Sequence, residues 1–465
     1  MGKKPEYLER KLQPGQKALT FDPVKIAFFH YFFDERSAGV NRVVENNLEG
    51  LKHFYPNFQP TLIAEEFEEP LFNKHQRIVL DSKSAAEDER YTPFEKNFVR
   101  GEYIKDELIN LKREFRDGFV AENPLRGIDA GISKGLLKFA EDDKMVGSNI
   151  NYRNHDFFQD YPDDWIYFLK QFGNVRAPLP ISGNVTQFGL TTSMQDKLQN
   201  FFDGEAEVLR NSVICDDFAT KDDGKDGELR ELFEREGIVK PGEKIIAYPV
   251  RIDQRKNVEE AIFMTHILNK HHDGNYRLIV TATRDKDYDK KGEENVYQRK
   301  IEKFAEELEV PVSLGEAYKF IDGENFNVGN LYHISDLALT TAVKEGFGYV
   351  YVEPWVSGTP LIGRRIREVC EDFEYNGLSK KNLYDGSDLR ATRNWETRLK
   401  RLETMLKNPV SREAMVERLK LPEKIDYAKG RVDKNADIVK RVYGHIPVAR
   451  EMIASFKFPG YDKLK

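Results

Sequence analysis

The stretch KIIAYPVRIDQRKNVEEAIFMTHILNK, residues 244–270, sets the architecture expected for the second half of the chain. It opens with a short apolar run, Lys244–Pro249, that is typical of a buried strand, and Val258–Asn269 has the apolar spacing of a helix. A strand at Tyr276–Thr281 and a helix at Glu294–Leu308 are expected to follow. Strands and helices in alternation indicate a parallel sheet covered by helices. Further strands are expected at Val310–Leu314, Asp336–Thr340 and Pro360–Gly363.

The first half of the chain shows the same alternation. A strand is expected at Val24–His30, and a helix at Val40–Phe54 has its valines and leucines on one face. The aromatic run Phe28–Phe33 is expected to pack mainly in the core, and another amphipathic helix is expected at Ile128–Ala140. The remaining strands are expected at Pro60–Ala64, Gln76–Leu80, Gly118–Ala121 and Asn149–Arg153.

A polar segment, Asp216–Gly242, separates the two alternations and is expected to be a linker with one short polar helix. The sequence therefore predicts an α/β protein with two Rossmann-like, doubly wound domains, at residues 20–215 and 240–390. Ligands bind beyond the carboxyl ends of the strands in such sheets, so the two halves are expected to face a central cleft. From about residue 395 the chain is charged and helical in pattern.

Composition excludes several classes of protein. The chain has 465 residues, of which 40% are hydrophobic and 32% charged, and its net charge is -7 with both signs interspersed. These values predict folded domains and argue against a general nucleic-acid binder. Cys215 and Cys370 are too few for a disulfide framework and are expected to be buried thiols. The start, Met1–Gln16, lacks the apolar run of a signal peptide, and no stretch predicts a membrane span, so a cytoplasmic enzyme is expected.

A glycine-rich stretch, KEGFGYVYVEPW at residues 344–355, carries the first candidate binding residues. Gly346 and Gly348 stand where a backbone approaches a ligand closely or adopts a positive φ. The helix expected directly after them would present free amides and the positive end of its dipole to a diphosphate. Glu345 and Glu353 flank this turn, and carboxylates are good acceptors for the hydroxyls of sugar and ribose.

A second polar stretch, YPVRIDQRKN at residues 248–257, follows the strand that opens the second half. Arg251 lies at the end of that strand and Lys256 at the start of the next helix. Both could neutralise the charge that develops on a leaving diphosphate, Arg through its bidentate fork and Lys as a point charge. Electrostatic stabilisation of this kind is usually the largest single contribution to catalysis, so the pair is a candidate catalytic group.

These two stretches resemble the retaining glycosyltransferases of family 4, within the GT-B superfamily. The family pattern of two glutamates separated by seven residues matches Glu345 and Glu353, including the Gly-Phe-Gly after the first. The family's Arg and Lys, five apart in a loop that ends Lys-Asn, match Arg251 and Lys256. Val250 stands where the family usually has glycine.

The resemblance covers residues 244–373 well, whereas in the first half it is limited to isolated residues and short motifs. The dipeptide Leu314-Gly315 looks like the start of the family's nucleotide-base region. Gly39 resembles the glycine loop that approaches donor phosphate and acceptor. His155, in an Asn-His-Asp-Phe stretch after a strand, looks like the family's histidine at the donor sugar.

What the resemblance implies is a GT-B fold in which the C-terminal helices, residues 391–465, cross back to the first domain. Glu345 would hold hydroxyls of the transferred sugar, Glu353 the ribose, and His155 the sugar near its reacting face. Family members retain the anomeric configuration by front-face attack, in which the leaving phosphate helps to take the acceptor proton. No side-chain nucleophile is therefore expected, and the resemblance implies no metal or cofactor, because the basic pair takes the place of a metal in GT-B enzymes. The diphosphate would be held by Arg251, Lys256 and the amides of Gly346, Phe347 and Gly348.

The expected function is transfer of a hexosyl unit from a nucleoside diphosphate sugar to a soluble acceptor, a small molecule or a saccharide. Two alternatives remain open at this stage. One is a retaining GT-B disaccharide phosphorylase, in which Glu353 would be superfluous because there is no ribose. The other is a non-catalytic sugar-nucleotide binding protein. No nucleic-acid partner and no membrane span are expected. The sequence does not indicate an oligomeric state.

Other charged residues have two interpretations each. The Asp-Lys-Asp at residues 285–287 has the spacing of metal-binding aspartates in the other glycosyltransferase fold, but its charged surroundings favour simple solvation. Arg364 and Arg365 could contact an anionic substrate or lie at the surface. Arg126 and Arg153 could serve an anionic acceptor or have a structural role.

Overall fold

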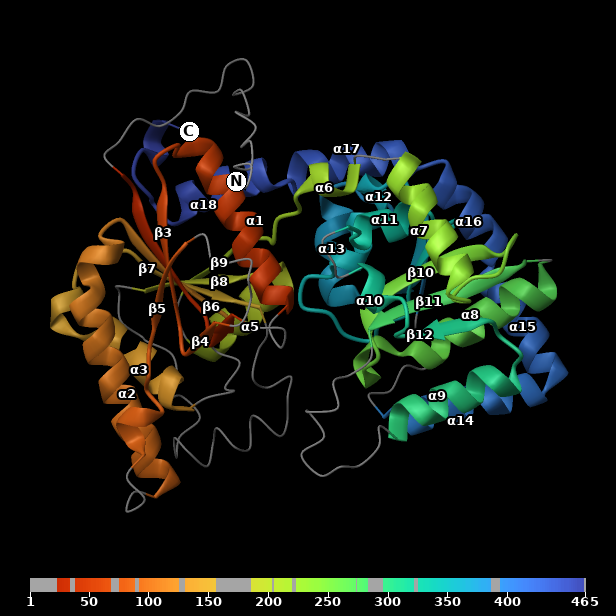
Figure 1. Cartoon of the computed structure of the whole chain (residues 1–465), viewed down its shortest axis with the longest axis horizontal. Helices are drawn as coiled ribbons and strands as arrows, with labels where there is room; N and C mark the ends of the chain where they lie inside the picture. Colours follow the sequence, from red (N-terminus) through yellow and green to blue (C-terminus); the bar gives the residue numbers. More distant parts are fainter. Residues whose placement is uncertain are drawn as a thin grey trace. The chain divides into compact units, whose positions relative to one another are not determined.

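A computed structural model describes residues 23–33, 38–67, 75–87, 92–124, 130–155, 185–202, 205–219, 223–272, 274–282, 296–321, 325–385 and 394–463. The chain divides into two compact units, which are coloured along the sequence in Figure 1. The first unit comprises Met1–Val213 together with Tyr443–Lys465. The second comprises Ile214–Val442.

The first unit is built on a parallel sheet of seven described strands, in the order β5-β3-β1-β6-β7-β8-β9. Strand β1 (Lys25–Phe29) pairs with β3 on one side and β6 on the other, so that Phe28 lies opposite Leu62 and Val120. Its last four residues are buried, as expected for a central parallel strand covered on both faces. The other strands are β3 (Gln59–Ala64), β5 (Gln76–Val79), β6 (Gly118–Glu122), β7 (Ile150–Asn154), β8 (Val185–Gly189) and β9 (Ala206–Val208), with a separate ribbon of β2 (Phe32–Phe33) and β4 (Glu66–Phe67).

Alternate residues of β1 point into two different cores, because side chains alternate across a strand. Ile26 and Phe28 pack in the core formed with helices α1 and α18. Ala27 and Phe29 pack in the core formed with α2 and α3. The sheet is therefore covered on both faces, as Figure 1 shows. The described helices of this unit are α1 (Ala38–Phe54), α2 (Pro93–Asn110), α3 (Ala130–Glu141), α5 (Thr192–Phe202) and α18 (His445–Ser455).

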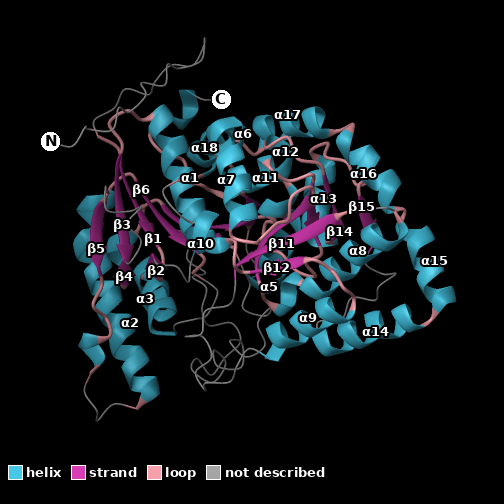
Figure 2. Ribbon diagram, turned by 45° about the vertical axis from the view of Figure 1, so that its right-hand side comes forward, coloured by secondary structure: helices cyan, strands magenta, loops and turns pink. Residues whose placement is uncertain are grey.

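The described residues of the second unit form a parallel sheet of six strands in the order β12-β11-β10-β13-β14-β15. Figure 2 shows the strands in magenta with helices around them. The central strand β10 carries Ile246, which lies opposite Leu278 of β11 and Leu337 of β13. The strands are β10 (Lys244–Arg251), β11 (Tyr276–Ala282), β12 (Val312–Leu314), β13 (Leu337–Thr340), β14 (Leu361–Arg365) and β15 (Leu383–Asp385). The helices are α6 (Cys215–Ala219), α7 (Asp223–Arg235), α8 (Val258–His271), α9 (Val296–Glu307), α10 (Tyr318–Ile321), α11 (Val328–His333), α12 (Glu353–Val356), α13 (Arg367–Tyr375), α14 (Trp395–Lys407), α15 (Pro409–Leu419), α16 (Leu421–Lys429) and α17 (Val432–Val442).

The predicted α/β class with two Rossmann-like parallel sheets is confirmed. The segment expected as a linker differs, because residues 215–219 and 223–235 form helices α6 and α7 of the second unit. Leu229 and Phe233, four residues apart, are fully buried and attach α7 to this unit in spite of its many charges. Cys215 and Cys370 are both buried and free, as expected. Among the described helices, none combines the length and the apolar character needed to cross a bilayer.

Candidate active site

A short loop after β10 carries the two cations that the sequence singles out. Arg251 is the last residue of β10, and the Asp253 side chain accepts a hydrogen bond from the Arg255 amide (2.7 Å), which starts a 3-10 turn at Gln254–Lys256. Asn257 then takes a left-handed conformation (φ 54°) before α8 begins. Asparagine tolerates this region better than most residues. The turn and the left-handed residue together redirect the chain between strand and helix.

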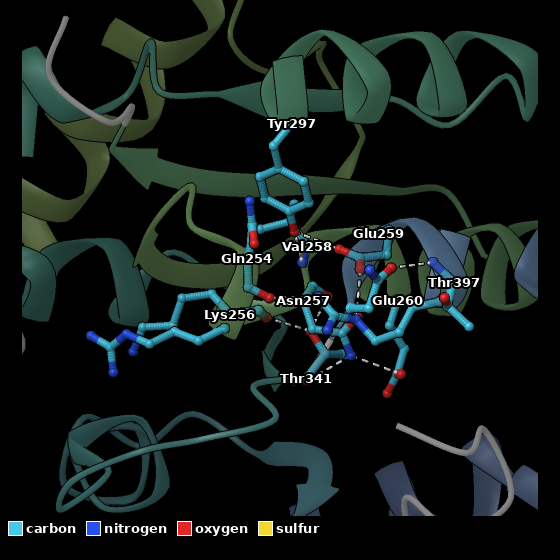
Figure 3. A network of polar contacts seen from close by, with 12 residues as sticks. Gln254, Lys256, Asn257, Val258, Glu259, Glu260, Tyr297, Thr341 and Thr397 are labelled. Carbon is cyan, nitrogen blue, oxygen red and sulfur yellow. Dashed lines mark hydrogen bonds and ion pairs between the residues drawn. The ribbon is translucent and has the colours of Figure 1, made fainter. Parts of the chain in front are cut away.

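The Asn257 side chain ties this loop to the segment that follows β13. It is fully buried, and its Nδ2 donates to the Thr341 carbonyl (2.9 Å) and to Glu260 Oε2 (2.8 Å). In return, Thr341 Oγ1 donates to the Asn257 carbonyl (2.8 Å). Figure 3 shows these residues around the loop. The segment after β13 leads to Glu345, so the two stretches picked out by the sequence are neighbours in the fold.

Lys256 and Glu345 form a direct ion pair. Lys256 Nζ lies 2.6 Å from Glu345 Oε1, and the two side chains are only 12% and 8% exposed. Burial lowers the pKa of Lys256, although the Glu345 carboxylate acts against this shift. Arg255, which the sequence analysis did not single out, places Nη1 3.8 Å from Glu345 Oε2. The glutamate is therefore flanked by two cations.

The other cation of the loop, Arg251, is exposed at the end of β10. Burial opposes the charged form of Asp253, but Arg255 above all, with Lys256 and Arg251, outweighs it and lowers the pKa of that carboxyl. Asp253 is thus an internal counter-ion of the loop. It also orders the turn through its bond to the Arg255 amide.

The glycine turn departs from its prediction. A helix was expected from about Tyr349, but the chain forms a single 3-10 turn, Tyr349–Tyr351, and then the four-residue helix α12. So short a helix has few aligned peptide dipoles, so the predicted helix-dipole contribution to anion binding is small. Gly348 has φ 87°, and a Cβ at that position would lie 2.7 Å from the Tyr351 ring. Glycine is therefore required at residue 348 on conformational and steric grounds.

The neighbours of Gly348 differ in exposure. Gly346 is partly exposed, whereas the Phe347 side chain is buried and packs against Phe373, with ring centroids 5.6 Å apart. Phe347 thus anchors the turn in the core. Glu353 is the first residue of α12 and is 4% exposed.

The first unit has a buried polar cluster at the carboxyl ends of its central strands. Glu122 closes β6, and its Oε2 lies 2.6 Å from His155 Nε2, just beyond β7. Its Oε1 lies 3.5 Å from Arg153 Nη1 and accepts from Asn47 Nδ2 (3.4 Å). Burial raises the pKa of Glu122, but Arg153 and His155 outweigh it, and the pKa lies below its ordinary value. His30 Nδ1 contacts the Glu122 carbonyl at 3.0 Å.

This cluster explains several predicted residues of the first half. His155 is 6% exposed and is oriented by Glu122, which the sequence analysis missed. The signal was a carboxylate at the end of an apolar strand. Arg153 does not serve an acceptor, because it is fully buried and donates to the Arg210 carbonyl and to Asn211 Oδ1. Gly39 lies in the first turn of α1.

The remaining charged candidates are structural or lie outside the described residues. Arg364 is neither at the surface nor placed for substrate, because its guanidinium is buried against the Glu260 carboxylate. Arg365 pairs with Glu374 of α13 (2.5 Å). Residues 285–287 and Arg126 lie outside the part of the chain that the structure describes.

Three solved structures share this fold. A glycosyltransferase from Rickettsia africae has a TM-score of 0.58 at 13% identity, covering 94% of this chain and 98% of that one. Anabaena HepE, solved in complex with UDP, has a TM-score of 0.57 at 11% identity, covering 93% and 100%. The UDP-forming α,α-trehalose-phosphate synthase of Burkholderia vietnamiensis has a TM-score of 0.55 at 11% identity, covering 94% and 99%. The fold is that of the GT-B glycosyltransferases.

The sequence gives the more specific assignment. Residues 230–421 match the profile of the family described as glycosyl transferases group 1. The mannosylglucosyl-3-phosphoglycerate synthase of Petrotoga mobilis is 25% identical over 378 residues, which are 77% of this chain and 67% of that protein. The protein is a glycosyltransferase, and the predicted enzyme class is confirmed.

Proposed function

We propose that this protein moves a hexosyl unit from a nucleoside diphosphate sugar to a small soluble acceptor and retains the anomeric configuration. The observation that carries the proposal is the 2.6 Å ion pair between Lys256 and Glu345. It brings together a cation suited to phosphate and a carboxylate suited to sugar hydroxyls. In a donor whose diphosphate is joined to a hexose, the diphosphate suits Lys256 and the hexose hydroxyls suit Glu345.

In the proposed reaction, the bond between the anomeric carbon and the donor phosphate oxygen breaks. The acceptor oxygen forms its bond on the same face of that carbon, and the acceptor proton passes to an oxygen of the leaving phosphate. Negative charge grows on the nucleoside diphosphate, where Arg251 and Lys256 stabilise it. The scheme requires no side-chain nucleophile, metal or cofactor.

The two glutamates have different proposed partners. The donor diphosphate would replace Glu345 as the partner of Lys256, and this leaves the Glu345 carboxylate to accept hydrogen bonds from the sugar. Glu353 would accept hydrogen bonds from the ribose hydroxyls. The amides of Gly346, Phe347 and Gly348 are proposed to contact the diphosphate.

Two residues of the first unit have proposed roles as well. His155 would bind the donor sugar, and its bond to Glu122 supports this role because it orients the ring. If Nε2 carries the proton that Glu122 accepts, Nδ1 is left as a hydrogen-bond acceptor. Gly39, in the first turn of α1, is proposed to lie by the donor phosphate and the acceptor.

The names of the relatives suggest which substrates to try first. The Petrotoga protein is named for a phosphoglycerate product and the Burkholderia protein for a trehalose phosphate and UDP. The Anabaena structure contains UDP. We therefore propose a phosphorylated small acceptor and rank uridine first among the donor bases.

The test is a screen of UDP-, GDP-, ADP- and TDP-glucose and GDP-mannose, each with 3-phosphoglycerate or glucose 6-phosphate as acceptor. Donor binding is followed first by thermal shift, since a ligand at a hundred times its Kd adds about 2.7 kcal/mol of stability. The product is then analysed by NMR for its anomeric configuration. Inversion at that carbon would refute retention. Turnover with inorganic phosphate that survives Glu353→Ala would favour the phosphorylase alternative, and donor binding without transfer or hydrolysis would favour the binding protein.

A further inference from the structure

One buried arginine, far from the cation loop in sequence, holds both ends of the turn that carries Lys256. Arg398 lies in the first turn of α14, and its side chain is 2% exposed. Its Nη2 donates to the Gln254 carbonyl (2.5 Å), and its Nε donates to Asn257 Oδ1 (3.0 Å). Gln254 begins the 3-10 turn and Asn257 ends the loop, so a single guanidinium bonds to residues on both sides of Lys256.

The same Nε also donates to Glu259 Oε1 at 2.8 Å, and this pair is buried. The other oxygen of Glu259 accepts from the Tyr297 hydroxyl, which in turn accepts from the Val258 amide (3.2 Å). Figure 3 shows Tyr297 and Glu259 beside the loop. The network thus joins three helices, α8, α9 and α14, at the base of the cation loop.

The loop depends on such contacts for its shape. Its only regular structure is a three-residue 3-10 turn, followed by a left-handed residue, and neither is stable in isolation. Arginine suits this position because its planar fork can donate to two acceptors in fixed directions, whereas lysine presents a single flexible ammonium.

We propose that Arg398 is a positioning residue for the glycosyltransferase reaction: by fixing Gln254 and Asn257, it sets the direction in which Lys256 meets the donor diphosphate. This inference rests on the proposed function, in which Lys256 binds that group. The plainer interpretation is that the Arg398–Glu259 pair only joins α14 to α8. That interpretation predicts a loss of stability but no loss of anion affinity at temperatures where the protein is folded.

A double-mutant cycle separates the two interpretations. The affinities of wild type, Arg398→Gln, Lys256→Ala and the double variant are measured by calorimetry, with UDP, GDP, ADP and inorganic pyrophosphate titrated separately. Charged hydrogen bonds of this kind predict about a tenfold loss of affinity for each single variant. If Arg398 acts through Lys256, the double variant binds no more weakly than Lys256→Ala alone. If the two losses multiply to about a hundredfold, the positioning role is wrong.

Matched variants control for stability. Glu259→Gln removes the charge of the buried pair but leaves the Arg398 contacts to the loop, so it should lower the melting temperature and keep the affinity within about twofold. Arg398→Lys should recover part of the melting temperature but not the affinity, and it replaces Arg398→Gln in the cycle if that variant fails to fold. Lys400→Gln, an exposed cation on the same helix, should change neither quantity. A lower melting temperature in Arg398→Gln with unchanged affinity would support the plainer interpretation, and an equal affinity loss in Glu259→Gln and Arg398→Gln would refute a role that depends on the loop contacts.

The two proposals fail in different ways. If wild type binds none of the four probes, or Lys256→Ala binds them as wild type does, the donor site itself is wrong and this inference falls with it. If Lys256→Ala is weakened and Arg398→Gln is not, the donor site stands and only the role of Arg398 is refuted.

Discussion

At the scale of single residues, the buried Glu122 carboxylate has the clearest consequence for pH. Its pKa in the folded protein lies below the ordinary 4.5, because the charge of Arg153 and the hydrogen bond to His155 outweigh the effect of burial. The unfolded chain therefore binds more protons in the window just below pH 4.5, and stability falls as the pH decreases through the folded pKa. Above pH 4.5 the contribution is fully present.

Glu122→Gln should flatten this acid dependence. The variant cannot lose a charge below pH 4.5, so its unfolding free energy should fall less steeply there than that of wild type. At neutral pH it should be less stable by about 3–5 kcal/mol, since Arg153 keeps a buried charge without its counter-ion. Urea unfolding at a series of pH values measures both effects. Glu102→Gln, which removes a surface carboxylate paired with Lys138, should cost only about 0–1 kcal/mol.

Gly348 is the second residue with a specific expected effect. Gly348→Ala places a methyl group on a residue with φ 87°, 2.7 Å from the Tyr351 ring. The unfolding free energy should fall by about 1–2 kcal/mol for the strained backbone and by a further 1–3 kcal/mol for the clash. Gly358→Ala is the control: φ is 78°, but nothing lies within 4 Å of the added carbon. Equal losses of unfolding free energy in the two variants would show that the Tyr351 contact is unimportant.

Part of the residue-level picture could be predicted from sequence, and part could not. Lys256 and Glu345 could be predicted from the sequence, because each stands in a local pattern of charged residues and glycines. Glu122 was not predicted, because its importance depends on His155, which follows a different strand. The same holds for Arg153, whose burial is set by the packing of several strands and by contacts to distant carbonyls.

At the scale of elements, the cation loop depends on the strand end beside it. Thr341 Oγ1 donates to the carbonyls of Asn257 (2.8 Å) and Lys256 (3.2 Å). Thr341→Val removes both bonds and should cost about 0.5–1.5 kcal/mol, because the Asn257 carbonyl still accepts from the Glu260 amide (3.1 Å) and the Lys256 carbonyl from the Tyr248 hydroxyl (2.6 Å). It should also weaken UDP binding. Thr265→Val is the control, since that buried hydroxyl donates to a carbonyl within α8 (2.9 Å).

Denaturant unfolding and calorimetric titration with UDP measure the two effects of Thr341→Val. Thr265→Val should lose stability but keep its affinity for UDP. Unchanged affinity in Thr341→Val would mean that the loop keeps its shape without this contact.

Element prediction was incomplete: the strands at β1 and β10 were predicted, whereas the long helix α2 and the strand β8 were not. The strands at β1 and β10 follow from continuous apolar runs bounded by polar residues. The three-residue strands β9 and β15 were missed, because they join an existing sheet edge and need little propensity of their own. The helix expected from about Tyr349 begins only at Glu353, with Pro354 in its first turn, where proline is well tolerated.

At the scale of the whole molecule, the chain leaves its first unit after Val213 and returns to it at Tyr443. The returning segment is part of the first core rather than an appendage. Met452, Ile453 and Phe456 are fully buried with the residues of β1 and α1, and the Phe456 ring lies 4.6 Å from that of Phe188. Asn149 Nδ2 donates to the Phe456 carbonyl, so β7 is held by the same segment.

Removing residues 443–465 should therefore unfold the first unit and spare the second. Each large apolar side chain that is buried on folding contributes about 1.5–3 kcal/mol to the unfolding free energy. Seven buried apolar side chains lie in the described part of this segment, a total on the order of 10 kcal/mol that is comparable to the whole stability of a domain. They are Tyr443, Val448, Ala449, Met452, Ile453, Phe456 and Phe458.

Differential scanning calorimetry with and without UDP tests this expectation. The truncated chain should lose one thermal transition and keep the one that UDP raises, because the proposed donor cations and glutamates all lie within Ile214–Val442. Two point variants identify the transitions beforehand: Phe456→Ala should lower only that of the first unit, and Met415→Ala, in α15, only that of the second. If truncation removed the UDP-sensitive transition, UDP binding would not belong to the second unit alone. If both transitions remained, residues 443–465 would not be needed for the fold of the first unit.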